Sequence, residues 1–271
     1  MTTTPDEMSP VSRTALAVAR VRAHESRRPD PLFVDPYAAG FAEAAGMPLT
    51  APGGVRLSSL VAGLVVHITL RTRFYDDRLR AAGAEQVVLL AAGLDTRAYR
   101  LDWPAGTRLW ELDLPPVLDF KQQVLDAAGA EPACERGVLP GDLLDPGWPR
   151  RLVAAGFDPQ RPTAWLAEGL VVYLSAEQAA GLLTAVGSLS APGSRLLMER
   201  GRDVSLTPYD PALAHVIELW QGGLGPDTDQ WLNARGWQAR TTSLADCGAD
   251  CGRPLPEGVG LDSGFIEAVR G

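Results

Sequence analysis

The sequence predicts an α/β protein whose core is a doubly wound, mostly parallel β-sheet, preceded by a helical N-terminal segment. The chain has 271 residues, which is enough for one large α/β domain. From residue 84 onward, short apolar runs alternate with helix-like segments at intervals of about 20–30 residues, a pattern typical of βαβ crossovers. Before residue 84, apolar residues recur at helical spacing and no segment resembles a strand.

Three helices are predicted before residue 84. The first covers residues 12–24, because Ser12 can accept a hydrogen bond from the free N–H groups of a first helical turn. The second covers residues 36–45 and has a proline in its first turn. The third covers residues 58–82, where apolar side chains again recur at helical spacing.

The core is predicted to contain short buried strands and the helices that connect them. Apolar runs typical of buried parallel strands cover residues 86–90, 107–112, 137–139, 163–166 and 194–198. Helical segments cover residues 115–128, 148–155, 175–189 and 227–235, and a last strand covers residues 237–243. Residues 246–260 are rich in Gly, Pro and Asp, which is typical of a surface loop.

No Gly/Ser-rich or Pro-rich linker divides the chain, so we expect one compact unit with two parts. Residues 1–83 are predicted to form a helical cap, or lid. Residues 84–271 are predicted to form the core, with an insertion at about residues 201–226 on the side where a second substrate, the acceptor, would bind.

Composition and charge argue against several classes of function. The net charge of −8 at pH 7 repels a phosphate backbone, and no basic run interleaved with aromatics counters it, so we expect no nucleic-acid partner. No stretch approaches the roughly 18 apolar residues that a membrane helix needs, so we expect no membrane partner. The N-terminus lacks the pattern of a secretory signal, and an odd number of cysteines is typical of the reducing cytoplasm.

Several polar side chains are interpreted as structural. Cys247 and Cys251 are spaced C-x₃-C but lack a second pair of ligands, so we expect no metal site. Asp76 and Asp77 are interpreted as a solvated helix face. His67 lies on an apolar helix face and is interpreted as a packed core residue.

Ligands of doubly wound sheets bind at the carboxyl ends of the strands, and the first predicted strand ends in a loop of small residues. This loop contains Ala92, Gly93 and Asp95. Small residues let a ligand approach the backbone closely, but the loop is equally consistent with a tight strand-to-helix turn. It lacks the G-x-G-x-x-G pattern that a dinucleotide pyrophosphate needs, which disfavours NAD.

Two acidic residues end the second predicted strand. Glu111 and Asp113 lie on one face because strand side chains repeat every second residue. Asp113 is nearer the strand end and is predicted to accept hydrogen bonds from both hydroxyls of a ribose. The alternative is that both acids complement the dipole of the helix that follows.

Further acids follow the third and fourth predicted strands. Asp142 could accept from an adenine amino group while Leu143 covers the ring, although Asp142 taken alone is better explained by an Asx turn. Glu168 precedes Gly169 and would be half-buried, which is costly unless a cation or a donor meets it. Three carboxylates without a phosphate-binding loop suit an adenosine-bearing cation, and S-adenosylmethionine fits this description.

Six blocks of the sequence carry a family resemblance. They are TALAVARVRA at residues 14–23, RPDPLF at 28–33, RTRF at 71–74, AGLDTRAYRL at 92–101, ELDLP at 111–115 and AEGLVVYL at 167–174. In this order they resemble the S-adenosylmethionine-dependent methyltransferases related to leucine carboxyl methyltransferase. The resemblance implies a Rossmann-like sheet of the class I methyltransferase type with a helical N-terminal lid. It also implies S-adenosylmethionine as methyl donor and S-adenosylhomocysteine as product.

The resemblance further implies roles for individual residues. An arginine of the RTRF block meets the carboxylate of the donor's methionine part, with Arg71 preferred and Arg73 next. Asp113 binds the ribose, and Glu168 lies near the methionyl ammonium group. The full predicted cofactor set is Arg71, Arg73, Ala92, Gly93, Asp95, Asp113, Leu114, Asp142, Leu143, Glu168 and Gly169. Ala91 departs from the wider methyltransferase class, which usually has glycine there.

The resemblance and a scarcity of bases favour a carboxylate as the methyl acceptor. A carboxylate is already anionic at neutral pH, whereas a phenol with a pKa of about 10 would benefit from a base. The histidines are His24, His67 and His215, and His215 in the insertion is the candidate base on the acceptor side. Tyr173 and Tyr209 are candidates for the wall of the acceptor pocket.

The predicted function is therefore an S-adenosylmethionine-dependent O-methyltransferase. It would convert the carboxylate of a small molecule, such as a polyketide or another secondary metabolite, to the methyl ester. Three alternatives remain: a phenolic O-methyltransferase, a protein that binds S-adenosylmethionine without turnover, and a dehydrogenase on the same fold.

Overall fold

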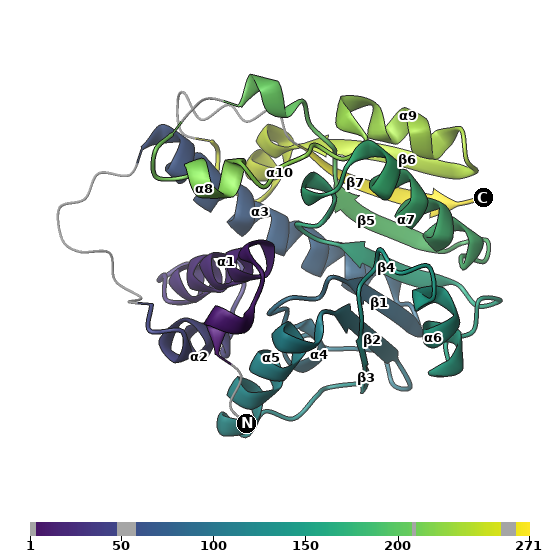
Figure 1. Cartoon of the computed structure of the whole chain (residues 1–271), viewed down its shortest axis with the longest axis horizontal. Coiled ribbons are helices and arrows are strands. Elements are labelled where there is room, and N and C mark those ends of the chain that lie inside the picture. Colours follow the sequence, from purple (N-terminus) through teal and green to yellow (C-terminus); the bar gives the residue numbers. More distant parts are fainter. Residues whose placement is uncertain (1–3, 48–57, 208–209, 256–263) are drawn as a thin grey trace.

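The computed structural model describes residues 4–47, 58–207, 210–255 and 264–271. In these ranges, strands form one seven-stranded sheet in the order β3-β2-β1-β4-β5-β7-β6, with helices on both faces (Figure 1). The strands are β1 (Gln86–Leu90), β2 (Arg108–Asp113), β3 (Glu135–Pro140), β4 (Thr163–Ala167), β5 (Arg195–Glu199), β6 (Trp237–Ser243) and β7 (Gly264–Arg270). The α-helices are α1 (Pro10–Ser26), α2 (Ala38–Ala44), α3 (Ser59–Ala82), α4 (Arg97–Arg100), α5 (Pro115–Ala127), α6 (Trp148–Ala154), α7 (Ala176–Ser188), α8 (Ala214–Ile217), α9 (Thr228–Asn233) and α10 (Leu244–Asp250).

The pairing of the strands confirms the predicted doubly wound, mostly parallel sheet. β1 lies between β2 and β4 and pairs with both in parallel, so that Val88 lies opposite Trp110 and Trp165. The chain moves outward from β1 to β3 and then crosses back to β4, which creates a switch point between β1 and β4. β7 is antiparallel to both of its neighbours.

Two layers of apolar side chains cover the two faces of the sheet. On one face, Val87 and Leu89 of β1 pack with residues of α1, α3 and α5. On the other face, Val88 and Leu90 pack with residues of α6, α7 and α9. Both faces of β1 are therefore buried, which explains its continuous apolar run.

The helices before residue 84 lie near the sites predicted for them, but two of them start at other residues. α2 begins at Ala38, so Pro36 precedes this helix and is not in its first turn as predicted. Ser9 accepts a hydrogen bond from the N–H of Ser12, so α1 begins a turn earlier than the predicted start at Ser12. Ser58, the predicted start of the third helix, caps α3, and its hydroxyl also donates to Asp210 of the predicted insertion. In the described ranges no helix combines the length and the apolarity needed to cross a membrane.

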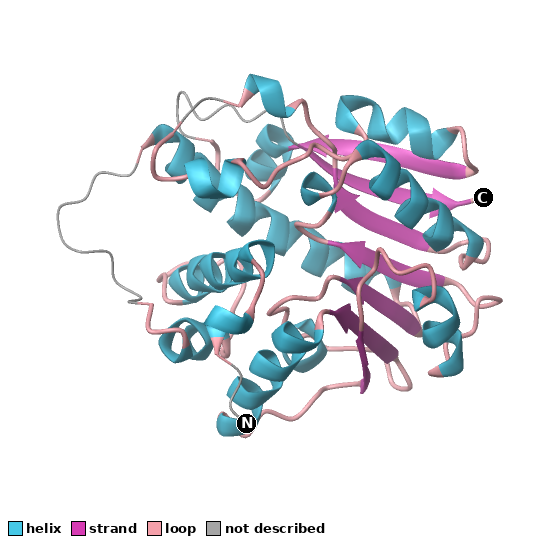
Figure 2. Cartoon of the chain, viewed as in Figure 1, coloured by secondary structure: helices cyan, strands magenta, loops and turns pink. Residues whose placement is uncertain are grey.

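α3 packs directly on the sheet. The rings of Phe74 and Tyr75 lie 5.2 Å and 5.7 Å from that of Phe265 on β7. α1 lies on the side toward which the arrows of β2, β4 and β5 point (Figure 2), so this helix covers the carboxyl edge of the sheet. The division into a cap at residues 1–83 and a core at 84–271 stays a prediction.

Two elements near the C-terminus were not predicted. β7 inserts between β5 and β6, although no strand was predicted after residue 243. α10 occupies the start of the segment 246–260, so a loop is the wrong prediction for that part. Ser243 caps this helix by accepting from the N–H of Asp246, and the burial of Leu244 and Cys247 holds it in place despite its polar composition. Residues 256–260 lie outside the described ranges.

Candidate active site

A first cavity of about 150 Å³ lies where α1 and α3 meet the carboxyl ends of β1, β2 and β4. Seven residues of the predicted cofactor set line it: Arg71, Ala92, Gly93, Asp95, Asp113, Glu168 and Gly169. α1 contributes apolar and small side chains, among them Ala15 and Val18. The cavity therefore combines residues from five segments of the sequence, and it lies at the switch point of the sheet.

Asp113 connects the loops that follow β1 and β2. Its Oδ2 accepts a hydrogen bond from the N–H of Gly93 at 2.6 Å, and its Oδ1 accepts from the N–H of Leu114 at 2.7 Å. Burial raises the pKa of this carboxyl, although the two hydrogen bonds oppose the shift. A carboxylate has about four acceptor positions, so Asp113 keeps capacity for two further donors.

Glu111 does not share this role. Its side chain is fully buried and pairs with Lys121 at 2.8 Å and with Arg136 at 2.7 Å. The carboxylate is thus neutralised inside the protein, as a buried charge requires. Of the two acids at the end of β2, only Asp113 lines the first cavity.

Ala91 is strained. Its φ is 51°, and among the residues that the structure describes it is the one residue other than glycine with a positive φ. This left-handed conformation costs an L-amino acid roughly 1–2 kcal/mol. Gly93 adopts a similar φ of 50°, and a Cβ there would come within 3.5 Å of Ala15 on α1. The turn after β1 therefore has the backbone shape that glycine allows, and at Ala91 an extra methyl group is retained at a cost.

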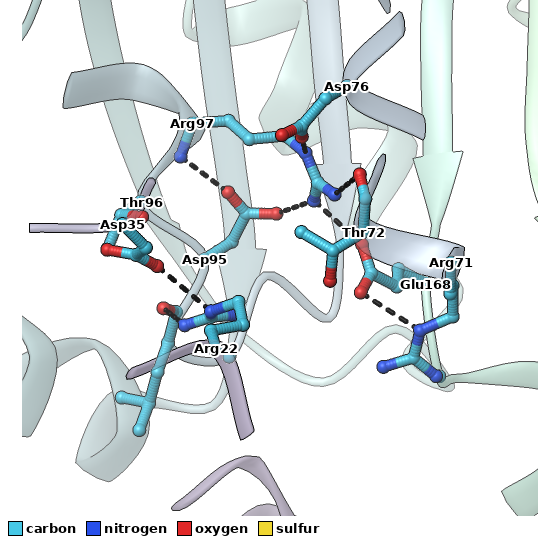
Figure 3. Close-up of polar contacts among 12 residues, drawn as sticks. Arg22, Asp35, Arg71, Thr72, Asp76, Asp95, Thr96, Arg97 and Glu168 are labelled. Atoms are coloured by element: carbon cyan, nitrogen blue, oxygen red, sulfur yellow. Dashed lines mark hydrogen bonds and ion pairs between the residues drawn. The ribbon is translucent and has the colours of Figure 1, made fainter. Parts of the chain in front are cut away.

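Arg97 is the centre of a buried ion-pair network (Figure 3), and its role was not predicted. Its Nε lies 2.7 Å from Asp76 Oδ1, and its Nη1 lies 2.7 Å from Glu168 Oε2 and also contacts Asp95. The side chain is 1% exposed. Burial works to lower the pKa of Arg97, but the three carboxylates outweigh it and hold the pKa well above its usual value.

The interpretation of Asp76 as a solvated residue is wrong. Asp76 is fully buried, and besides Arg97 it contacts Arg100, whose Nη1 and Nη2 lie 2.5 Å and 2.8 Å from its two oxygens. Burial raises the pKa of Asp76, but the two arginines outweigh this and lower it. Successive helical residues point about 100° apart. Asp77 accordingly points elsewhere, and its side chain is 42% exposed.

Arg71 lies between two carboxylates. Its Nε donates to Glu168 at 3.0 Å and its Nη1 donates to Glu199 at 2.5 Å. Burial would lower the pKa of Arg71, but Glu199 and Glu168 together raise it. Gly169 packs against this guanidinium, and a Cβ on Gly169 would come within 3.2 Å of Nη1.

Glu199 is a site residue that the sequence reasoning missed. It ends β5, and its two oxygens accept from the N–H of Gly169 at 3.0 Å and 2.9 Å as well as from Arg71. Burial raises the pKa of Glu199, and Arg71 only partly opposes the shift. The signal that finds this residue is its position at the end of the fifth strand. The same rule located Asp113 and Glu168.

A second cavity of about 270 Å³ adjoins the first. The two cavities share six lining residues: Thr14, Val18, Arg71, Gly169, Leu170 and Tyr173. The remaining walls are mainly apolar, with polar exceptions at His67, Glu199, Arg200, Arg202 and His215. Both predicted acceptor-side residues, Tyr173 and His215, therefore line the second cavity. The hydroxyl of Tyr173 donates to Thr14 at 3.3 Å.

His67 both packs and faces the second cavity. Its ring lies 5.3 Å from that of Phe265, in agreement with its interpretation as a packed residue. It also lines the second cavity, which that interpretation did not include. Burial, followed by the charges of Arg71 and Arg202, lowers the pKa of His67 to about 3, so the imidazole is neutral at pH 7.

Arg73 and Leu114 are absent from the lining of the first cavity. Arg73 donates from Nε to Asp77 at 2.7 Å and from Nη1 to the carbonyl of Leu32 at 2.9 Å, and its side chain is 39% exposed. Leu114 is the residue before α5, and its backbone N–H binds Asp113. Their predicted contacts with the cofactor stay predictions.

Asp142 and Leu143 also lie outside the lining of the first cavity. Asp142 is exposed and accepts a hydrogen bond from the N–H of Leu144 at 2.8 Å, which is the Asx turn that the sequence offered as the alternative. Leu143 packs against the core layer that contains Leu90. Their predicted contacts with adenine stay predictions, and Tyr209 lies outside the described ranges.

The C-x₃-C pair lies away from both cavities. Cys247 is buried in α10, and its Sγ donates to the carbonyl of Leu70 at 3.8 Å. Burial, together with the neighbouring Cys251, raises the pKa of Cys247 to about 12. Among the described residues no group of three or more His, Cys, Asp or Glu side chains is arranged to hold a metal ion.

The profile of the leucine carboxyl methyltransferase family matches residues 15–187 of this sequence. The chain belongs to the leucine carboxyl methyltransferase family. The matched segment contains most of α1, the carboxyl ends of β1, β2 and β4, and the cluster of Arg71, Arg97 and Glu168.

Relatives of this leucine carboxyl methyltransferase family member cover nearly its whole length. A protein of Parafrankia sp., provisionally named an S-adenosyl-L-methionine-dependent methyltransferase, is 47% identical over 96% of this chain and 87% of its own. A protein of Mycolicibacterium smegmatis with the same provisional name is 41% identical over 91% of this chain and 89% of its own. The protein is therefore a methyltransferase that depends on S-adenosylmethionine.

Solved structures share the fold of this family member. One is provisionally named a methyltransferase and comes from Thermobifida fusca; it has a TM-score of 0.57 at 19% identity and covers 93% of this chain and 94% of its own. Magnesium protoporphyrin IX methyltransferase from Synechocystis, solved with bound S-adenosylmethionine, has a TM-score of 0.50 at 15% identity and covers 81% of this chain and 87% of its own. Both support the class I methyltransferase fold.

The polar residues that line the first cavity fit the chemical groups of S-adenosylmethionine. The cofactor carries two ribose hydroxyls, for which Asp113 has acceptor capacity, and a carboxylate, for which Arg71 is a buried cation. It carries no phosphate, which agrees with the missing G-x-G-x-x-G pattern in the loop after β1.

Proposed function

We propose that this protein is an O-methyltransferase that converts the carboxylate of a small molecule to its methyl ester, as one step of secondary metabolism in the cytoplasm. The observation that supports it most is the pair of adjoining cavities with a shared wall that includes Arg71 and Gly169. A group-transfer enzyme needs two substrates side by side, because alignment of the reacting atoms supplies most of the rate. The first cavity suits the methyl donor and the second suits the acceptor.

On the donor side, each polar residue has a proposed partner. Asp113 would accept from the ribose hydroxyls, Glu168 would meet the ammonium group, and Arg71 would bind the carboxylate. The loop after β1 would contact the methyl donor through Ala92, Gly93 and Asp95. When bound, S-adenosylmethionine supplies an electrophilic methyl group on its sulfonium.

On the acceptor side, the second cavity combines apolar walls with positive charge. Leu64, Ile68 and Val216 are among the apolar residues, and Arg200 and Arg202 are among the charged ones. Such a lining suits an organic acid with a hydrocarbon body. His67 is a poor base because its pKa is about 3, and a carboxylate acceptor needs none.

The residues of the chain would act by orientation and by exclusion of water. α1 covers the carboxyl edge of the sheet and contributes Thr14 and Val18 to both cavities. The Tyr173–Thr14 hydrogen bond ties this helix to the segment after β4. A well-aligned bimolecular reaction gains on the order of 7–11 kcal/mol from orientation alone.

Glu199 favours a second candidate, methylation of a phenol. Its carboxylate lines the acceptor cavity, and burial raises its pKa, which brings a carboxyl closer to the range useful for proton abstraction. In that reaction Glu199 would accept the phenolic proton, and the phenolate oxygen would bond to the methyl carbon as the carbon–sulfur bond breaks and S-adenosylhomocysteine leaves.

Methyl-labelled S-adenosylmethionine and a panel of carboxylic acids and phenols would test the proposal. A carboxylate acceptor gives a methyl ester, which releases labelled methanol in mild alkali, whereas a phenol gives an ether that survives it. Alkali-labile product is the expected result, and alkali-stable product would favour the phenol candidate. Binding of S-adenosylhomocysteine without transfer to any acceptor would indicate a binding protein that lacks turnover.

A further inference from the structure

Arg71 is the charged residue that both cavities share. Glu168 lines the first cavity and Glu199 lines the second, and Arg71 contacts both carboxylates. The three side chains come from three elements: α3, the segment after β4, and the end of β5. A change in the charge next to Arg71 in one cavity therefore alters the electrostatic environment of the carboxylate in the other cavity.

The negative charges of Glu168 and Glu199 are not equally stabilised by arginines. In the described part of the chain, Glu168 pairs with two arginines, Arg71 and Arg97, whereas the ion pairs of Glu199 comprise Arg71 alone. Burial raises the pKa of Glu168, but the two arginines outweigh it and lower the pKa, whereas the pKa of Glu199 is raised. If a third carboxylate approaches Arg71, protonation of Glu199 therefore costs less free energy than protonation of Glu168.

We propose that Glu199 is a positioning residue that takes up a proton when Arg71 binds the carboxylate of the methyl donor, and so prepares the second cavity for an anionic acceptor. This inference rests on the proposed function, in which Arg71 binds the donor. The step is a simple protonation: one proton from solvent bonds to a carboxylate oxygen of Glu199, and no other bond forms or breaks. The protein carboxylate thereby becomes neutral while the donor's carboxylate replaces it beside the guanidinium.

The surroundings of Glu199 allow this exchange. Arg71 and Tyr75 of α3 and Glu168 of the segment after β4 interact electrostatically with Glu199. His67, also on α3, lines the same cavity. Further charged or titratable side chains of the second cavity are Arg200, Arg202 and His215. Glu168 disfavours a charged Glu199, and the hydrogen bonds from the N–H of Gly169 keep the carboxyl in position.

The consequence is an order of binding. A charged Glu199 on the wall of the second cavity repels an acceptor carboxylate, and in a low-dielectric site this repulsion is strong. A neutral Glu199 removes it. The donor would therefore bind first, and the acid would enter a cavity that has lost one negative charge.

Calorimetry with S-adenosylhomocysteine tests the exchange without an identified acceptor. The probe is titrated into the whole protein at pH 7 in phosphate and in Tris buffer, whose ionisation enthalpies differ, so the difference in heat counts the protons taken up. We expect wild-type protein to take up between about half a proton and one proton per probe bound, and its affinity to fall by up to about tenfold per pH unit.

Glu199→Gln removes the titrating group and keeps the shape. The variant should bind the probe more tightly, by about tenfold for each unit by which pH 7 exceeds the pKa of Glu199, because no protonation is then needed. Its proton uptake should fall by the amount assigned to Glu199, and Glu177→Gln, an exposed glutamate on α7, should behave as wild type. The difference between variant and wild type cancels any proton exchanged by the probe itself.

Two failures can be told apart. If the probe does not bind wild-type protein, the proposed donor site is wrong. If it binds with no proton uptake, or if Glu199→Gln takes up as many protons as wild type, the proposed role of Glu199 is wrong. If Glu199→Gln does not fold, Glu199→Ala serves for the same comparison, and a wild-type protein that takes up no proton contradicts the proposal without any variant.

Discussion

The carboxylate of Asp113 accepts a hydrogen bond at 2.6 Å from the N–H of Gly93, which lies 20 residues earlier in the chain. This contact joins the ends of β1 and β2, and both residues line the first cavity. The acid predicted to bind the ribose thus also holds a loop that lines the first cavity. Such a residue orients the site before any ligand arrives.

Replacement of Asp113 should weaken binding of the cofactor. We expect Asp113→Ala to cost about 1.5–3 kcal/mol of binding free energy, as for hydrogen bonds to a charged group. Calorimetry with S-adenosylhomocysteine measures the effect, and Asp119→Ala, an exposed aspartate on α5, is the control. Unchanged affinity in Asp113→Ala would remove this residue from the binding site.

Replacement of Asp76 should destabilise the fold. Asp76→Ala leaves Arg97 and Arg100 with less compensation in a buried region, so we expect a loss of about 3–5 kcal/mol in the free energy of unfolding. Asp77→Ala is a matched control one residue away, and its half-exposed ion pair is worth about 1 kcal/mol or less. Urea unfolding compares the two, and equal losses would contradict the network.

The same ion-pair network should make the free energy of unfolding depend on pH in the acidic range. Asp76 has a lowered pKa, so its contribution is fully present above the unfolded-state value of about 3.9 and is lost as pH falls through the lower folded-state pKa. We expect the free energy of unfolding to decrease below about pH 4. Asp76→Asn should flatten this decrease relative to wild type, and an identical pH profile would show that other carboxyls cause it.

Relief of the strain at Ala91 should stabilise the protein. Ala91→Gly removes the Cβ from a residue with φ of 51°, so we expect a gain of up to about 1 kcal/mol, or roughly 2–4 °C in Tm. Ala92→Gly, whose φ is not positive, should instead destabilise because glycine adds backbone freedom to the unfolded chain. Thermal unfolding measures both, and a lower Tm for Ala91→Gly would show that its methyl group packs productively.

Loss of His215 should change acceptor binding more than the rate of transfer. A carboxylate acceptor needs no base, so His215→Ala should alter KM and leave kcat within about tenfold of wild type. A general base is typically worth 10²–10⁴-fold in rate. A fall of that size in kcat, with an acceptor found in the panel, would assign His215 to proton transfer and favour a phenol.

The order of elements could be predicted from the sequence because each depends on local pattern. The run at residues 86–90 matches β1, and the predicted third helix matches α3 to within one residue. β7 was missed because it follows a Gly- and Pro-rich stretch at the chain end and owes its stability to pairing on both sides with β5 and β6. A strand of this kind is specified by its neighbours more than by its own residues.

The sequence by itself determined the family, the cofactor and the strand ends where acids gather, since motif order and side-chain chemistry are local properties. Only the tertiary structure decided which charges meet. It buried Asp76 while leaving Asp77 half-exposed, and it placed Glu199 of β5 against Arg71 of α3, 128 residues away. Ion pairs between distant segments depend on how helices rotate and pack against the sheet, and no spacing along the chain records that.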